Sequence, residues 1–194
     1  MILGIFPYGS QVYGTTDENS DTDLIQVVDK APRSETQFHL PGIDITVWTA
    51  DEFQRLLQEH DPSALECWFL PNDKVIRTDE FEFQFDLDLG RLRRSFSAKA
   101  SNSWVKAKKK MEIHGKFRIG IKSLFHSLRL LRFGIQIAKF GKLLHYNEEN
   151  LVWKTIVEQG FTSWQPYKDH WQEYYNRLHS EFKAVAPLAK GEQE

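Results

Sequence analysis

Residues 2–28 read ILGIFPYGSQVYGTTDENSDTDLIQVV, and this stretch decides the expected fold. The apolar residues 2–6 indicate a buried strand, and the turn formers of residues 7–10, Pro-Tyr-Gly-Ser, are expected to end it. A loop rich in turn formers follows over residues 15–20, and residues 23–28 predict a second strand. The chain therefore begins with two strands of a small sheet.

The next segment adds strands and then helices. Residues 43–48 predict a third strand, with which residues 38–40 are expected to pair. Thr49, with Glu52 three residues later, has the spacing of a capping box, which predicts a helix over residues 49–59. Asp61 followed by Pro62 predicts a second helix start, with an end near residue 71.

From about residue 85 onward the pattern is helical. Apolar side chains over residues 121–138 follow the three-four spacing of one helix face, and Gly141 is expected to end that helix. Further helices are expected over residues 148–159 and 171–185. The sequence thus predicts an α+β fold with a small mixed sheet and a C-terminal helical lobe. We expect two domains, residues 1–85 and 86–194.

The net charge of −2 over 194 residues conceals three blocks of opposite sign. Residues 1–90 carry 18 acidic and 5 basic side chains, a balance of −13, and residues 91–142 carry 15 basic and one acidic, a balance of +14. Residues 143–194 carry 5 basic and 8 acidic side chains, a balance of −3. A basic central block points to a polyanionic ligand, although it could also meet the acidic first block.

The composition excludes some classes of protein. Hydrophobic residues make up 41% of the chain and charged residues 27%, as in globular proteins. No apolar run reaches the roughly 18 residues that a membrane span needs, so no membrane partner is expected. The single cysteine, Cys67, permits no internal disulfide, which favours a reducing, cytoplasmic setting.

Three features of the first 50 residues carry chemistry. Gly9 and Ser10 follow a predicted strand, where a glycine lets backbone N–H groups approach phosphate oxygens and the serine adds a donor. Asp21 and Asp23 open the next strand two residues apart, so both carboxylates are expected on one face. Asp44 lies between Ile43 and Ile45 in an otherwise apolar strand, where a carboxylate is costly without a partner.

Each feature alone has an ordinary explanation. Gly-Ser is a common turn dipeptide, the Asp pair could bond to nearby backbone, and Asp44 could be an exposed acid on an edge strand. Together they predict three convergent carboxylates, and like charges so placed repel unless a cation or a proton joins them. Hard oxygen ligands of this kind suit Mg²⁺, or Mn²⁺ in its place.

This order of motifs resembles the nucleotidyltransferase superfamily that includes DNA polymerase beta. The shared pattern is a Gly-Ser turn (residues 9–14, GSQVYG), an Asp-x-Asp pair (residues 20–24, SDTDL) and a third acid on a neighbouring strand. Residues 61–66, DPSALE, and residues 126–131, HSLRLL, are similar to later helices of the predicted nucleotidyltransferases linked with RNA repair. The likeness covers roughly residues 3–142. In that family a helix usually precedes the first strand, whereas here the predicted strand begins at Ile2.

The resemblance implies a palm-like core that transfers a nucleoside monophosphate from an NTP to a hydroxyl, with release of pyrophosphate. It implies that Asp21 and Asp23 bridge two metal ions, and that Asp44 binds the metal near the acceptor and either serves as base or helps that metal acidify the hydroxyl. Ser10 and the Gly9 turn are then expected to grip the outer phosphates.

The helical lobe offers two further groups of candidates. Lys122, His126 and Arg129 share a polar stripe and are candidates for binding the nucleotide, although a solvated helix face explains them equally well. A second group could contact a nucleic-acid backbone and stack a base, or form a plain solvated surface: Trp104, Lys106, Lys108, Lys109 and Lys110.

The sequence does not identify the molecule that accepts the nucleoside monophosphate. RNA or another nucleic acid is the first expectation, because of the basic block. The alternatives are a protein or small-molecule acceptor, as in toxin–antitoxin and antibiotic-modifying relatives, and a binding module without turnover. The three intact acids argue against the last.

Overall fold

A mixed sheet forms the centre of the first of two units, which comprises Met1–Asp86 and Leu143–Asn147. The structure is a computed structural model and describes the chain except residues 19, 31–35, 79–81 and 189–194. The strands are β1 (Ile2–Tyr8), β2 (Thr22–Val28), β3 (Gln37–Leu40), β4 (Ile43–Thr49) and β5 (Arg77–Thr78). Within the described residues their order is β3-β4-β2-β1-β5, with β2 and β4 parallel and the other pairs antiparallel.

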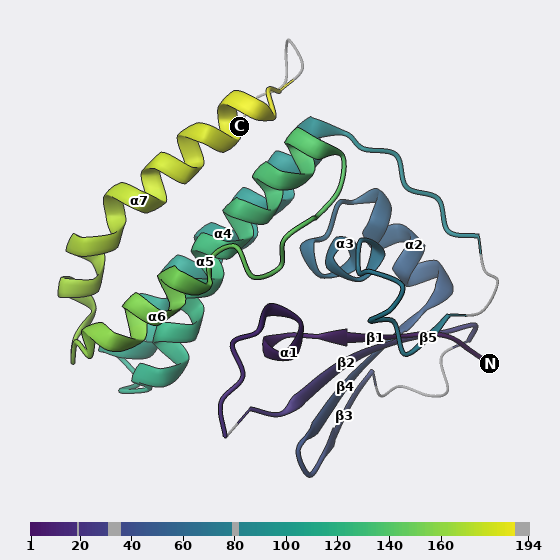
Figure 1. The fold of residues 1–194 in the computed structure, drawn as a ribbon, viewed down its shortest axis with the longest axis horizontal. Helices are drawn as coiled ribbons and strands as arrows, with labels where there is room; N and C mark the ends of the chain where they lie inside the picture. The colour runs from purple at the N-terminus through teal and green to yellow at the C-terminus, as the bar shows by residue number, and fades with distance from the viewer. Residues whose placement is uncertain (19, 31–35, 79–81, 189–194) are drawn as a thin grey trace. The chain divides into compact units, whose positions relative to one another are not determined.

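Two helices, α2 (Ala50–Gln58) and α3 (Pro62–Trp68), lie on one side of this sheet (Figure 1). Their aromatic contacts show which strand positions face them. The ring of Phe53 in α2 stacks on Phe6 of β1 and on Trp48 of β4, with 5.9 Å between the ring centroids in each case. Stacked rings of this kind bury large apolar areas, so they fix α2 on this face of the sheet.

The starts of both helices follow the local sequence. The Thr49 side chain accepts a hydrogen bond from the Glu52 backbone N–H at 3.1 Å, and the Asp61 side chain accepts from the Ser63 backbone N–H at 2.9 Å. Each cap satisfies a backbone donor that the first turn of a helix leaves without an intrahelical partner. The two predicted helix starts are confirmed.

The first strand is longer than predicted. Pro7 and Tyr8 pair with Leu24 and Asp23 of β2, so they belong to β1 and not to the turn that the sequence indicated. The prediction was wrong because proline is tolerated where a strand has a free edge. That condition holds here, since within the part of the chain that the structure describes β5 pairs with Gly4 and Ile5 of β1 and not with Pro7.

The second unit, Leu87–Lys142 and Glu148–Glu194, is helical. Its described helices are α4 (Leu89–Glu112), α5 (Phe117–Phe140), α6 (Asn150–Gln159) and α7 (Trp164–Val185). Figure 1 shows α4, α5 and α7 running alongside one another. A Cβ atom on Gly134 would lie 2.5 Å from the Phe182 ring, so the glycine allows α5 and α7 to approach closely.

The boundaries of these helices confirm one expectation and correct another. Gly141 adopts the left-handed conformation with φ of 70° and caps α5, as predicted. Helix α7, however, begins at Trp164, seven residues before the predicted start at Trp171. Pro166 lies in its first turn, where a proline costs no helical hydrogen bond, so the helix can begin before it.

The α+β class with a mixed sheet and a helical C-terminal part is confirmed by these elements. Residues 143–147 return to the first unit, and the Tyr146 hydroxyl there donates to the Glu66 backbone carbonyl at 2.7 Å. That residues 1–85 and 86–194 form separate domains stays a prediction. Among the described helices, none combines the length and apolar character that crossing a bilayer requires.

Candidate active site

Four side chains form a row across one face of the sheet. Tyr8 of β1 is in register with Asp23 of β2, Asp23 with Asp44 of β4, and Asp44 with His39 of β3. Side chains in register on adjacent strands point to the same face, and neighbouring strands lie about 4.8 Å apart. Asp23 and Asp44 therefore stand side by side on the face that carries α2.

The turn after β1 lies directly against one of these acids. Gly9 has φ of 72° and ψ of −148°, a backbone conformation that residues other than glycine rarely adopt. A Cβ atom built on Gly9 would lie 2.2 Å from the Asp23 Oδ2 atom. The backbone at Gly9 can contact the Asp23 carboxylate only because the residue is glycine. The structure thus brings the predicted turn and the predicted acid together.

A short helix follows this turn. Helix α1 comprises Ser10–Tyr13. Its first turn is formed by the backbone N–H groups of Val12 and Tyr13, which donate to the Gly9 carbonyl at 3.1 and 3.2 Å. The Gln11 side chain donates to the Thr22 hydroxyl at 2.8 Å and so joins α1 to β2. Ser10, the predicted phosphate ligand, is therefore the first residue of a helix turn fixed at both ends.

Asp21 is exposed and lies immediately before β2, two residues ahead of Asp23. The preceding loop is held by its own hydrogen bonds, since the Ser20 hydroxyl donates to Asp17 Oδ1 at 3.0 Å and accepts from the Asp17 backbone N–H at 2.9 Å. The convergence of Asp21 with the other two acids stays a prediction.

Asp44 has a partner that sequence reasoning missed. The His39 Nδ1 atom lies 2.6 Å from Asp44 Oδ1, on the exposed edge strand β3. The signal for it was present, because Pro41-Gly42 between residues 37–40 and 43–49 predicts a hairpin, and a hairpin places His39 opposite Asp44. The imidazole holds one oxygen of the carboxylate in a fixed direction.

Helix α3 anchors the turn region from the other side. The Tyr13 hydroxyl donates to Glu66 Oε2, and the Tyr8 hydroxyl donates to the Ser63 hydroxyl at 3.1 Å. Glu66 is only 3% exposed, so its carboxylate depends on such donors. Sequence reasoning noted residues 61–66 as a motif but did not assign Glu66 this structural role.

A divalent cation needs several hard oxygen ligands close together. Among the described residues, no group of three or more His, Cys, Asp and Glu side chains is arranged to hold a metal ion. The pair of Asp23 and Asp44 provides two hard oxygen donors on one face, and Mg²⁺ is commonly bound by one or two carboxylates together with substrate phosphates. The residues therefore fit a metal that arrives with its substrate.

The predicted nucleotide ligands of the helical lobe differ among themselves. Lys122 is exposed, whereas Arg129 is only 6% exposed and its guanidinium carbon lies 5.4 Å and 5.7 Å from the ring centroids of Phe125 and Phe133. The Arg129 Nη2 atom donates to His126 Nδ1 at 2.8 Å. Burial, together with the nearby Arg129 charge, lowers the pKa of His126 well below its usual value. The stripe is thus partly buried, and its role in nucleotide binding stays a prediction.

The predicted nucleic-acid ligands lie on α4. The ring of Trp104 stacks on Tyr175 of α7, with centroids 4.3 Å apart, and meets Trp164 edge to face. One face of the indole is therefore already covered by protein. The lysines at positions 106, 108 and 109 are exposed and that at 110 is part-buried, and Lys108 pairs with Glu112 at 3.9 Å. Binding of nucleic acid by these residues stays a prediction.

Comparison with known proteins found similarity to solved structures. No family model and no curated protein matches the sequence. Among solved structures, the chain is similar to spectinomycin adenyltransferase AAD(9) from Enterococcus faecialis, determined with ATP and spectinomycin. The two chains are 12% identical, the match covers 97% of this chain and 84% of that one, and the TM-score is 0.42. A TM-score this low establishes no shared fold, so the proposal below depends on the geometry of Gly9, Asp23 and Asp44.

Proposed function

We propose that this chain is a metal-dependent nucleotidyltransferase that moves a nucleoside monophosphate from an NTP to a hydroxyl acceptor. The observation that carries the proposal is the register of Asp23 with Asp44 on adjacent parallel strands, with the Gly9 backbone against Asp23. Two neighbouring carboxylates beside a glycine turn form a site for a divalent cation and the phosphates attached to it.

We propose Asp23 and Asp44 as ligands of Mg²⁺ or Mn²⁺, and Asp21, which the structure does not group with them, as a third ligand that would join them once the cation is bound. Two like charges on one face repel each other, and a cation between them removes that repulsion. When bound, the metal would supply neutralisation of the triphosphate charge and polarise the reacting oxygens. The carboxylates would hold that cation, and the cation would in turn keep the nucleotide in place.

The turn and the acceptor acid have separate roles in the proposed reaction. Ser10 and the backbone of the Gly9 turn bind the outer phosphates, and Tyr13, bound to Glu66, keeps that turn in position. The acceptor oxygen forms a bond to the α-phosphorus, the bond from that phosphorus to the bridging oxygen breaks, and pyrophosphate leaves. Asp44, oriented by His39, takes the proton of the acceptor hydroxyl.

A nucleic acid is the proposed acceptor. The basic block of residues 91–142 supports it, together with the exposed side chains of Lys106 and Lys109, which lie three residues apart on one side of α4. Trp104 offers less support than the sequence indicated, because Tyr175 already stacks on it. A protein or small-molecule acceptor is the competing proposal.

Incubation with each radiolabelled NTP, Mg²⁺ or Mn²⁺, and separate pools of RNA, protein and small molecules tests the reaction and identifies the acceptor. Asp23→Asn and Asp44→Asn should each reduce labelling by at least about a hundredfold, because each removes a charged metal ligand. Asp51→Asn, an exposed acid on α2, is the matched control and should label normally. Equal labelling by all four proteins would contradict the proposal, and Mg²⁺-dependent NTP binding without turnover would indicate a binding module instead.

A further inference from the structure

The face of the sheet that points away from α2 and α3 is apolar. Those two helices lie on the other side of the sheet (Figure 1), where the ring of Phe53 stacks on Phe6. Because neighbouring residues of a strand point to opposite faces, the alternate positions of each strand form the second face. Strand pairing sets three rows in register on this second face, here called the apolar face: Pro7, Leu24, Ile45 and Phe38; Ile5, Gln26 and Val47; and Thr22, Ile43 and Leu40.

Most side chains of the apolar face are accessible. Leu40 is 55% exposed and Phe38 is 37% exposed, and Val47 is the one buried member of the three described rows. On the face that α2 covers, in contrast, Ile25 and Val27 of β2 are 3% and 0% exposed. A sheet whose second face meets water ordinarily carries polar side chains there, in alternation with the apolar ones. The residues of the apolar face therefore indicate that another surface covers it.

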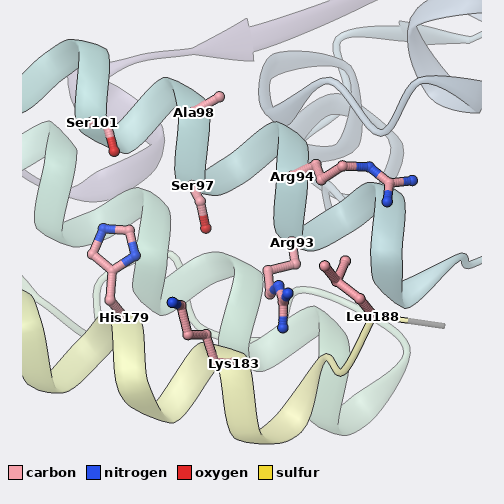
Figure 2. A pocket seen from close by; sticks show the side chains of 8 residues that line it. All are labelled: Arg93, Arg94, Ser97, Ala98, Ser101, His179, Lys183 and Leu188. Carbon is pink, nitrogen blue, oxygen red and sulfur yellow. The ribbon is translucent and has the colours of Figure 1, made fainter. Parts of the chain in front are cut away.

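The apolar face also lacks charge, since none of the residues in its three described rows is acidic or basic. Nucleic acids and anionic lipid surfaces are bound through lysine and arginine, so neither fits this face. The pocket between α4 and α7 in the second unit has the opposite character, because Arg94 and Lys183 line it (Figure 2). The core of a homodimer interface is apolar and depleted in charged residues. The composition of the apolar face matches that of such a core.

We propose that the apolar face binds the same face of a second copy of this chain. Two sheets can pack face to face about 10 Å apart, with the side chains of their inner faces interdigitated. A two-fold axis brings one surface against itself, so apolar rows meet apolar rows and no charge is buried. Asp23 and Asp44 lie on the opposite face and remain open to substrate. This inference does not depend on the nucleotidyl transfer proposed above.

The area of the apolar face sets the strength expected of this dimer. Four strands about 4.8 Å apart and about 20 Å long present roughly 400 Å² in projection. Two copies together cover roughly 800 Å² in projection, and the accessible surface that they bury is somewhat larger, in the size range of weak and transient interfaces. We therefore expect a protein that is monomeric when dilute and forms dimers as its concentration rises.

Sedimentation of the full chain, in reducing buffer from about 5 to about 500 µM, tests the dimer over the range expected for an interface of this size. Leu40→Lys places a charge in the apolar face and should raise the dimer Kd at least about tenfold, because each copy would bury an unpaired charge. Gln37→Lys changes an exposed residue of the same strand that points to the other face, so it should leave the Kd unchanged. Monomers at every concentration, growth beyond a dimer, or equal Kd values for the two variants would overturn the proposal.

Protection of an introduced thiol locates the interface independently. The single cysteine of the chain, Cys67, is buried, so a cysteine placed on β3 is the one that a maleimide modifies. Leu40→Cys should react several-fold more slowly at the highest concentration than at the lowest, because the dimer covers it. Gln37→Cys should react at the same rate at both concentrations. Protection of Gln37→Cys, or constant reactivity of Leu40→Cys, would place the contact elsewhere and reject the proposal.

Discussion

At the scale of single residues, the candidate site depends on Gly9. Its positive φ and the short distance that a Cβ atom would have to Asp23 Oδ2 impose two separate demands, and only glycine meets both. Gly42 shares the positive φ of 72° but has nothing within 4 Å of the position of a Cβ atom. A comparison of Gly9 with Gly42 therefore distinguishes the cost of backbone strain from the cost of a steric clash within one protein.

Gly9→Ala should lower the free energy of unfolding by about 2–4 kcal/mol, because it adds a clash to the strain of a positive φ. Gly42→Ala should cost about 1 kcal/mol, since only the strain applies. Urea denaturation of the two variants measures the difference. In the double variant Gly9→Ala/Asp23→Ala the clash is removed, so part of the stability should return. Equal losses in the two single variants would show that Gly9 does not contact Asp23.

His126 makes the stability of the second unit depend on pH. Its folded-state pKa is lowered by burial and by the charge of Arg129, so the unfolded chain binds a proton below about pH 6.5 that the folded chain does not. Folding is therefore weakened as pH falls through that value. Between pH 6.5 and 5.5 the loss should be about 1 kcal/mol relative to His126→Asn, in which an amide oxygen replaces the Nδ1 acceptor.

Urea denaturation at several pH values checks this expectation. His170→Asn, which changes an exposed histidine, should keep the pH dependence of the unchanged protein. If His126→Asn loses stability with falling pH as steeply as the unchanged protein does, the depressed pKa of His126 is refuted.

At the scale of elements, α1 is too short to be stable alone and depends on its neighbours. A single helical turn fixes many dihedral angles for few hydrogen bonds, so it needs tertiary contacts. Those contacts are Gln11 with Thr22 of β2 and Tyr13 with Glu66 of α3. Contacts with β2 and α3 therefore hold the proposed phosphate-binding turn in position.

Tyr13→Phe should lower the free energy of unfolding by about 1–3 kcal/mol, because the buried Glu66 carboxylate loses a donor. Tyr8→Phe is the matched control and should cost less, since it removes a bond between two neutral, part-buried hydroxyls. Adding Glu66→Gln to Tyr13→Phe should recover part of the loss, because a neutral amide is less costly to bury. Chemical denaturation measures all three, and equal losses for the two tyrosines would contradict this role of Glu66.

At the scale of the whole molecule, charge is segregated along the chain. Residues 1–90 have a balance of −13, which includes the three proposed metal ligands, and residues 91–142 have a balance of +14. A cation bound only by the folded chain should stabilise it by mass action. The metal is therefore expected to affect stability as well as turnover.

Thermal unfolding should show this linkage. Mg²⁺ with NTP at about a hundred times its Kd adds about 2.7 kcal/mol, which should raise the Tm by about 5 °C or more for a chain of this size. The same NTP in EDTA should give a smaller shift. Asp23→Asn and Asp44→Asn should lose the metal-dependent part, and Asp51→Asn should retain it. If adding Mg²⁺ leaves the Tm unchanged in the presence of every NTP, the result would argue against the metal site.

Local sequence was sufficient for most elements of the fold. The helix starts at Thr49 and Asp61 and the helix end at Gly141 follow from hydrogen bonds and dihedral preferences that act within a few residues. The α+β class follows from the change of apolar spacing along the chain. The Gly9 turn and the acids Asp23 and Asp44 were identified from the same local patterns.

Other features depended on distant parts of the chain. The register that places Asp23 beside Asp44, and the packing of α4 against α7, both involve residues far apart in sequence. Patterns within a few residues specify hydrogen bonds and backbone angles, but packing decides which faces meet. The sequence by itself therefore determined which elements form and which side chains carry chemistry, and only the tertiary structure decided which of those side chains became neighbours.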